Sequence, residues 1–112
     1  MTYLINAQQR KASRSTLYFE FQKGTFKQKH WLADSVYLHA DTFDRLELYY
    51  LFSASLPDFD YYYFTEVSPS QYAELKTKAM ACGGEIAAVF EELDVWVAAC
   101  FRQNAFFTIC GI

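Results

Sequence analysis

The sequence lacks the short motifs that mark common catalytic and metal-binding sites. Its three cysteines, Cys82, Cys100 and Cys110, are widely spaced and form no CxxC pair, which excludes a zinc knuckle or a redox motif of that kind. The two histidines, His30 and His39, belong to no HxxH or HExxH pattern. The chain also contains no GxSxG, GxGxxG or P-loop sequence. We therefore predict no enzymatic activity, no metal site and no cofactor.

Long apolar runs and flexible linkers are also lacking. No window reaches the ~20 apolar residues that cross a membrane, and the first residues have neither the basic start nor the apolar run of a signal peptide. Only two prolines and four glycines are present, and no repeat divides the chain. With 112 residues, 53% of them hydrophobic and 20% aromatic, we expect a single domain over residues 1–112. The expected location is the cytoplasm, where the cysteines stay reduced.

The charges are distributed unevenly along the chain, although the formal net charge is only −3. Residues 1–33 hold six cations and one acid, whereas residues 34–66 hold one cation and seven acids. Residues 67–112 hold three cations and five acids. This overall acidic balance argues against nucleic acid as a partner, because phosphate contacts need clustered lysine and arginine. The two oppositely charged halves either pair within the fold or leave a mostly acidic face for a partner.

Local patterns predict an α+β domain with a single sheet and about three helices. Leu17, Phe19 and Phe21 alternate with polar residues, which is typical of a strand. Residues 35–40, 59–67 and 106–110 are predicted as further strands. Seven aromatic side chains are predicted for the core: Phe19, Phe21, Phe64, Phe90, Trp96, Phe106 and Phe107.

The three predicted helices cover residues 41–53, 68–83 and 85–102. The first would be capped by Asp41 and would place Phe43, Leu46 and Tyr50 on one stripe, although the β-prone residues 49–52 leave a strand as an alternative. The second has the strongest local signal. Ser68 can cap it, Pro69 fits its first position and Gln71 completes a capping box. The third keeps an apolar stripe of helical period.

Four sets of residues are candidates for sites of chemistry, and each has a plainer explanation. A cysteine can meet a histidine in space, but all three cysteines sit among apolar residues, which raises a thiol pKa. The pair Gly83-Gly84 can hold a phosphate but is more typical of a helix end. Carboxylates at Asp58 with Asp60, and at Glu91, Glu92 and Asp94, are compatible with a divalent cation, yet charged strand edges and solvated helix faces are commoner.

Residues 34–66 combine their seven acids with six of the nine tyrosines. Carboxylates steer a cationic partner, and tyrosine gives rigid contact area with a polar tip. This composition favours a surface that binds a basic protein. The residues predicted to contact that partner are Asp44, Glu47, Tyr49, Asp58, Asp60, Tyr61 and Tyr62.

Over about its last seventy residues, the chain resembles small bacterial immunity proteins of polymorphic-toxin and contact-dependent growth inhibition systems. The resemblance is carried by Phe43, Leu46 and Phe52, by the acidic aromatic run Phe59-Asp60-Tyr61-Tyr62, by the Ser68-Pro69 helix start, by Glu92-Leu93 with Trp96, and by the ending Phe107-Thr108-Ile109-Cys110-Gly111-Ile112. None of these is a catalytic motif.

The resemblance implies a non-enzymatic inhibitor that binds the toxic C-terminal domain of a cognate effector. Many such toxins are nucleases with basic clefts, which an acidic tyrosine-rich surface would cover. The chain would act as a monomer or weak homodimer, without contact to nucleic acid or membrane. The alternative is a small-molecule-binding or enzymatic α+β domain with an aromatic pocket, which would retain a ligand or metal.

Overall fold

The structure, a computed structural model, describes residues 3–112 and has an α+β architecture. Its antiparallel sheet has five strands in the order β1-β3-β2-β5-β4. The strands are β1 (Leu4–Ile5), β2 (Tyr18–Lys23), β3 (Val36–His39), β4 (Phe64–Val67) and β5 (Phe107–Cys110). The predicted fold class and single sheet are therefore confirmed. Strand β1 was not predicted, and it pairs only with β3.

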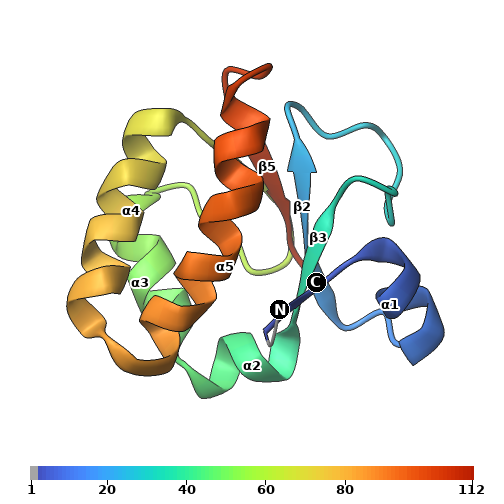
Figure 1. Cartoon of the computed structure of the whole chain (residues 1–112), viewed down its shortest axis with the longest axis horizontal. Helices are drawn as coiled ribbons and strands as arrows, with labels where there is room; N and C mark the ends of the chain where they lie inside the picture. The colour runs from blue at the N-terminus through green and yellow to red at the C-terminus, as the bar shows by residue number, and fades with distance from the viewer. Residues whose placement is uncertain (1–2) are drawn as a thin grey trace.

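Five helices lie within the described residues, where about three were predicted. They are α1 (Ala7–Ser13), α2 (Ala40–Arg45), α3 (Leu48–Ser55), α4 (Pro69–Cys82) and α5 (Gly84–Phe101). Figure 1 shows α3, α4 and α5 on one side of the sheet, and α1 with the connection from β2 to β3 on the other. No helix in residues 3–112 is long and apolar enough to cross a membrane.

The main core lies between the sheet and the helices α2 to α5. Alternate strand residues such as Phe19, Phe21 and Phe107 belong to this core together with Phe90 of α5. These four are fully buried, as predicted. The other three aromatics predicted for the core, Phe64, Trp96 and Phe106, are only partly buried. Trp96 lies at the edge, where its indole N–H donates to the Asp34 carbonyl at 2.9 Å.

The second face of the sheet is covered as well, which the alternating pattern did not indicate. Glu20 and Gln22 of β2 point to this face, and both are fully buried because residues 24–35 fold across it. In register with Glu20 lie Tyr37 of β3 and Cys110 of β5. This polar row is the setting for one of the sites described below.

The predicted helix over residues 41–53 was wrong in its continuity and in its cap. Glu47 takes a left-handed conformation with φ of 54°, which divides the segment into α2 and α3. Phe43 and Leu48 are five positions apart, so in one continuous helix they would point about 140° apart. The break lets both enter the core. His39, rather than Asp41, caps α2, since its Nδ1 accepts the Asp41 N–H at 3.0 Å. Tyr50 lies outside the buried stripe and is exposed.

The predicted strand over residues 59–67 was too long at its start. Only Phe64–Val67 pairs with β5, and the preceding residues form turns. The Phe59 N–H bonds back to the Leu56 carbonyl, and the Asp60 carboxylate accepts the Tyr62 N–H at 2.8 Å. Such a local carboxylate-to-backbone bond competes with strand pairing and overrides the β preference of the tyrosines.

The two long helices and the last strand follow the sequence prediction closely. Helix α4 begins with the expected capping box between Ser68 and Gln71, and Pro69 is its first residue. It ends at Cys82, one position before Gly83, which has a positive φ of 65°. Helix α5 then runs to Phe101. Local signals were sufficient here because capping and periodicity agree with the tertiary packing.

Candidate functional site

Four tyrosines between residues 49 and 63 are exposed to solvent. The exposed fractions are 75% for Tyr62, 73% for Tyr50, 63% for Tyr63 and 46% for Tyr49. Tyr61 is partly buried instead, with its ring edge-on to Phe19 and Phe43. Aromatic side chains held this far into solvent are typical of contact residues in protein interfaces.

Hydrogen bonds and a ring contact join four of the seven predicted contact residues, Asp44, Asp60, Tyr61 and Tyr62, and Glu47 is linked to Asp44 through its backbone N–H. The Tyr61 hydroxyl donates to the Asp44 carboxylate at 3.0 Å, and the Tyr61 ring packs edge-on against Tyr62. Asp60 is tied to Tyr62 through the turn described above. We call this the acidic tyrosine surface: Asp44, Glu47, Tyr49, Asp60, Tyr61 and Tyr62. Glu47 and Tyr49 join it at the start of α3, where Tyr49 packs against Phe59.

The one cation of residues 34–66, Arg45, is paired away from the carboxylates of this surface. Arg45 forms an ion pair with Glu85 of α5 at 2.7 Å, and Glu85 also accepts the Tyr3 hydroxyl. Within residues 3–112, neither Asp44 nor Asp60 takes part in an ion pair. The carboxylates therefore stay available to an incoming cation.

The hydroxyl of Tyr61 is held in its neutral form. Burial raises its pKa to about 12, and the hydrogen bond to Asp44 with the negative charge of that carboxylate adds to the effect. A neutral hydroxyl remains a donor to Asp44 throughout the physiological range. The pair thus fixes one edge of the acidic tyrosine surface.

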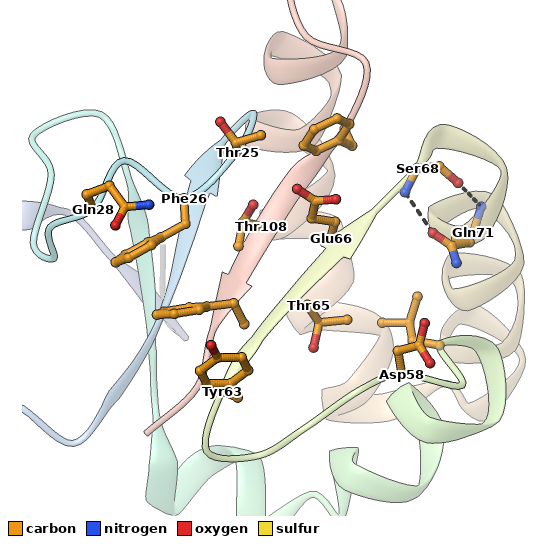
Figure 2. Close-up of a pocket in the computed structure, with 13 residues that line it drawn as sticks. Thr25, Phe26, Gln28, Asp58, Tyr63, Thr65, Glu66, Ser68, Gln71 and Thr108 are labelled. Carbon is orange, nitrogen blue, oxygen red and sulfur yellow. Dashed lines mark hydrogen bonds between the residues drawn. The ribbon is translucent and has the colours of Figure 1, made fainter.

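Asp58 is separated from the other predicted contact residues. It lines a groove of about 760 Å³ together with Tyr63 and Glu66. The floor includes Thr108 of β5, and one wall is the stacked pair Phe26 and Phe64, whose ring centroids are 4.0 Å apart. Figure 2 shows these side chains around the groove beside β4, which is an edge strand. The prediction that Asp58 and Asp60 share a strand face was wrong, because both precede β4.

A second cluster combines three chemically different side chains that lie far apart in the sequence. Atoms of Glu20, His30 and Cys110 that can bind a metal all lie within 4.8 Å of one another. Glu20 and Cys110 are register partners on β2 and β5, and His30 arrives from the connection that covers them. The sequence prediction missed this cluster. Its only local signal is the alternation that puts Glu20 on the polar side of its strand.

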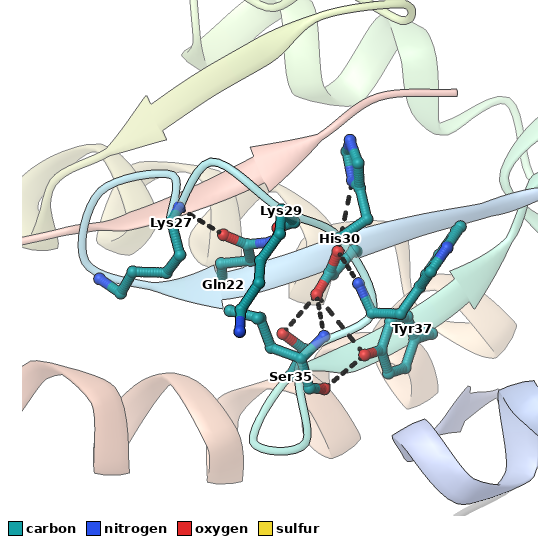
Figure 3. A network of polar contacts seen from close by, with 9 residues as sticks. Gln22, Lys27, Lys29, His30, Ser35 and Tyr37 are labelled. Atoms are coloured by element: carbon teal, nitrogen blue, oxygen red, sulfur yellow. Dashed lines mark hydrogen bonds and ion pairs between the residues drawn. The ribbon is translucent and has the colours of Figure 1, made fainter.

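Buried polar contacts hold the carboxylate of Glu20 in one orientation. It accepts the backbone N–H groups of Trp31 and Leu32, each at 2.9 Å, and the Ser35 hydroxyl at 2.7 Å. The Nδ1 atom of His30 lies 3.5 Å from the same carboxylate. Figure 3 shows how these groups converge under residues 24–35. Charge-assisted hydrogen bonds of this kind are among the stronger ones in proteins.

The cluster is poorly suited to nucleophilic catalysis. Burial raises the pKa of the Cys110 thiol to about 12, and the negative charge of Glu20 adds to the effect. A thiol that stays protonated is a weak nucleophile. The remaining cysteines offer no alternative, since Cys100 is buried in the core and Cys82 is exposed at the end of α4. His39 serves as the cap of α2.

The helix carboxylates named above as a possible cation site have structural partners. Glu92 accepts the backbone N–H groups of Tyr3 and Leu4, and this contact anchors β1 to α5. Asp94 accepts the Tyr72 hydroxyl and forms an ion pair with Lys76 of α4. These groups tie α5 to its neighbours, so this part of α5 is not simply a solvated face.

Comparison with known proteins adds no assignment. No family model, no curated protein and no solved structure matches the chain. The function is therefore argued from the residues and their geometry.

Proposed function

We propose that this protein is a non-enzymatic immunity protein that binds and neutralises the toxic domain of a cognate effector. The observation that carries the proposal is the acidic tyrosine surface, where exposed rings lie beside carboxylates that have no cationic partner within residues 3–112. The partner would be a basic protein, and a nuclease domain with a positively charged cleft fits best. The resemblance of the last seventy residues to bacterial immunity proteins points the same way.

The charge of the surface supports capture of a basic protein. Complementary potentials raise association rates from about 10⁵–10⁶ M⁻¹s⁻¹ toward 10⁸ M⁻¹s⁻¹ or more at low salt. Rapid capture matters for an inhibitor whose target is lethal while free. The pairing of Arg45 with Glu85 supports this role, because it removes the one cation of residues 34–66 from the field facing the partner.

The tyrosines would supply most of the affinity. An interface of about 800 Å² per partner contains a few residues whose truncation costs about 2–4 kcal/mol each, and tyrosine is enriched among them. Tyr62 is the leading candidate, because the residue is 75% exposed while its backbone N–H is held by the Asp60 carboxylate. Occupying the cleft of a nuclease with such rings and carboxylates would exclude the nucleic acid.

The test is a binding measurement with candidate basic toxin domains, starting with the one encoded beside this gene. The triple variant Glu47→Gln, Asp60→Asn and Tyr62→Ala should weaken the complex by at least about 100-fold and abolish protection of cells that express the toxin. Calorimetry or surface-based kinetics would give the Kd. An unchanged Kd would show that another face of the molecule binds the toxin.

A matched control changes two acids and one exposed apolar residue elsewhere. Glu74, Glu91 and Val95 lie on exposed positions of α4 and α5. The variant Glu74→Gln, Glu91→Gln and Val95→Ala removes the same amount of negative charge. It should bind the toxin like the wild type. A loss of affinity in the first variant alone would then show that the acidic tyrosine surface binds the toxin.

A second candidate function is a small-molecule-binding domain, and the groove beside β4 favours it. Its volume of about 760 Å³ falls in the range of ligand pockets, and the stacked Phe26 and Phe64 rings offer an aromatic wall. Mass spectrometry of the native protein would detect a retained ligand. The variant Phe26→Ala should then release it without affecting toxin binding.

A further inference from the structure

We propose that Glu20, His30 and Cys110 form a site for a divalent transition-metal ion, and that zinc is the ion it fits best. The three side chains offer one carboxylate oxygen, one imidazole nitrogen and one sulfur. Zinc accepts this mixed set, whereas calcium and magnesium prefer oxygen ligands alone. This inference is independent of the inhibitor function proposed above.

The spacing of the ligand atoms suits tetrahedral coordination. With metal–ligand distances of about 2.0–2.3 Å, ligand atoms around zinc lie about 3.4–3.6 Å apart. The Glu20 Oε1 to His30 Nδ1 distance is already 3.5 Å, and all three atoms lie within 4.8 Å of one another. A small movement of the His30 side chain can bring its imidazole nitrogen to bonding distance of the ion. Its side chain is 43% exposed, and it lies in the connection between β2 and β3.

The surroundings of Glu20 already resemble the outer shell of a metal site. Ligating carboxylates are oriented by hydrogen bonds from neighbouring groups. Here Trp31 N–H donates to Oε1, while Leu32 N–H and Ser35 Oγ donate to Oε2. Oε1 therefore keeps a lone pair for the ion on the side of His30. The orientation is set by the fold before any metal binds.

The charge balance of the cluster also favours a cation. Glu20 is fully buried, and within residues 3–112 its only ion-pair partner is the imidazole of His30. Buried carboxylates are usually paired or coordinate a metal. A divalent ion would displace the Cys110 thiol proton into solvent, and one carboxylate with one thiolate would then balance its charge in this buried position.

One coordination position would remain open toward solvent. A hollow of about 190 Å³ contains all three proposed ligands, and Trp31, Tyr62 and Phe64 form its aromatic walls. Three protein ligands and a fourth position for water or another ligand is a common zinc arrangement. Tyr62 also belongs to the acidic tyrosine surface, so the proposed metal lies next to that surface.

The experiment uses tag-free full-length protein, stripped with a chelator and titrated with Co²⁺. Binding should reach one ion per chain, with a thiolate-to-cobalt charge-transfer band and the visible bands of tetrahedral cobalt. Zinc should displace the cobalt and raise the Tm. Absence of the charge-transfer band would overturn the proposal.

Two variants and two matched controls locate the site. Cys110→Ala should abolish the charge-transfer band, and His30→Asn should weaken Co²⁺ binding by about 100-fold, since even outer-shell changes cost 10–100-fold. Cys82→Ser and His39→Asn should bind Co²⁺ like the wild type. His39→Asn is suitable because asparagine also caps helices.

The cobalt binding of the variants either upholds or overturns the proposed site. A band that survives Cys110→Ala but is lost in Cys82→Ser would place cobalt on the exposed thiol and overturn it. If circular dichroism shows that Cys110→Ala does not fold, the variant His30→Asn tests the proposal on its own, because His30 is exposed. Unchanged affinity in His30→Asn would then reject the site, and a loss of about 100-fold would uphold it.

Discussion

Glu20 is a charged residue that the fold uses as a buried anchor. Its carboxylate holds the backbone of Trp31 and Leu32 and the hydroxyl of Ser35, so that residues 24–35 close over the second face of the sheet. A buried carboxylate is tolerable only because these donors replace water. Stability and the placement of His30 therefore depend on the same side chain.

Replacing Glu20 with glutamine should destabilise the protein by about 3 kcal/mol, because an amide loses the charge and turns its N–H₂ toward a backbone donor. Urea unfolding in the presence of a chelator measures this effect without any metal contribution. The control is Glu66→Gln, an exposed acid near the same face, which should stay within about 0.5 kcal/mol of the wild type. Equal stability of the Glu20 variant would contradict the anchoring role.

The raised pKa of Tyr61 predicts how the stability of the protein changes with pH. Its pKa is raised from 10.0 to about 12 by burial and by Asp44, so the folded state favours the neutral phenol. The stability it contributes is fully present below pH 10 and is lost as the pH rises through about 12. Unfolding curves at several alkaline pH values should show the free energy of wild-type unfolding falling toward that of Tyr61→Phe. Tyr50→Phe, at an exposed position, should keep the wild-type slope. If the free energy of unfolding changed with pH in the same way for the wild type and Tyr61→Phe, Tyr61 would not be the source of the effect.

At the scale of elements, the chain end organises the tyrosine-bearing turns. After β5, the Gly111 N–H donates to the Tyr63 carbonyl and the Ile112 N–H to the Tyr61 carbonyl, each at 2.8 Å. Residues 61–63 are not part of a strand, yet these two bonds fix their backbone. The presentation of the exposed rings thus depends on the two residues that follow β5.

Gly111 is predicted to accept no side chain. A Cβ atom there would lie 2.7 Å from the Tyr63 nitrogen and would also clash with the Tyr61 carbonyl oxygen. Gly111→Ala should therefore cost about 1–3 kcal/mol of stability and weaken toxin binding, because the backbone under the tyrosines must move. Chemical unfolding and the binding measurement check the two effects.

The control for this substitution is Gly84→Ala. Gly84 has a positive φ of 55°, and a Cβ atom added there would meet no other atom within 4 Å. Alanine there should cost about 1 kcal/mol through backbone strain alone and leave toxin binding unchanged. Wild-type affinity in Gly111→Ala would show that the turns present their rings without help from the chain end.

At the scale of the whole molecule, the segregation of charge sets how partners approach. The acidic residues 34–66 supply the acidic tyrosine surface, while the six cations of residues 1–33 lie in and just after α1, at the end of β2 and in the connection to β3. The radius of gyration of 12.8 Å is close to the ~13 Å expected of a compact chain of this size. The opposite charges are separated along the chain, but the two regions meet at the hollow where Tyr62 lies beside His30 and Trp31.

The association rate with a basic partner should fall at least about tenfold as ionic strength rises from ~0.01 to ~1 M, because the screening length shortens from about 30 to about 3 Å. Stopped-flow kinetics measures this rate. The variant lacking the Glu47 and Asp60 charges should show a shallower dependence. Sedimentation over the same salt range tests the expectation of a monomer or weak homodimer. A salt-independent rate would argue against electrostatic steering.

The sequence by itself determined the helices in which local capping and apolar periodicity favour the same structure as the tertiary packing. Helix α4 was predictable from Ser68, Pro69 and Gln71, and α5 from its apolar period, because capping and amphipathic burial act within a few residues. It also determined the excess of acids and tyrosines in residues 34–66. Composition indicated a tyrosine-rich contact surface there but not which rings reach solvent: four tyrosines are exposed, whereas Tyr61 is partly buried.

Only the tertiary structure decided where those side chains meet. Core packing of Phe43 and Leu48 split the predicted helix at Glu47, and the turn at Asp60 delayed the start of the predicted strand to Phe64. Asp44 was thereby joined to Tyr61, while Asp58 was left in a separate groove. The meeting of Glu20, His30 and Cys110 depends on strand register and on a loop crossing a sheet. These are contacts between distant residues, and no local pattern encodes them.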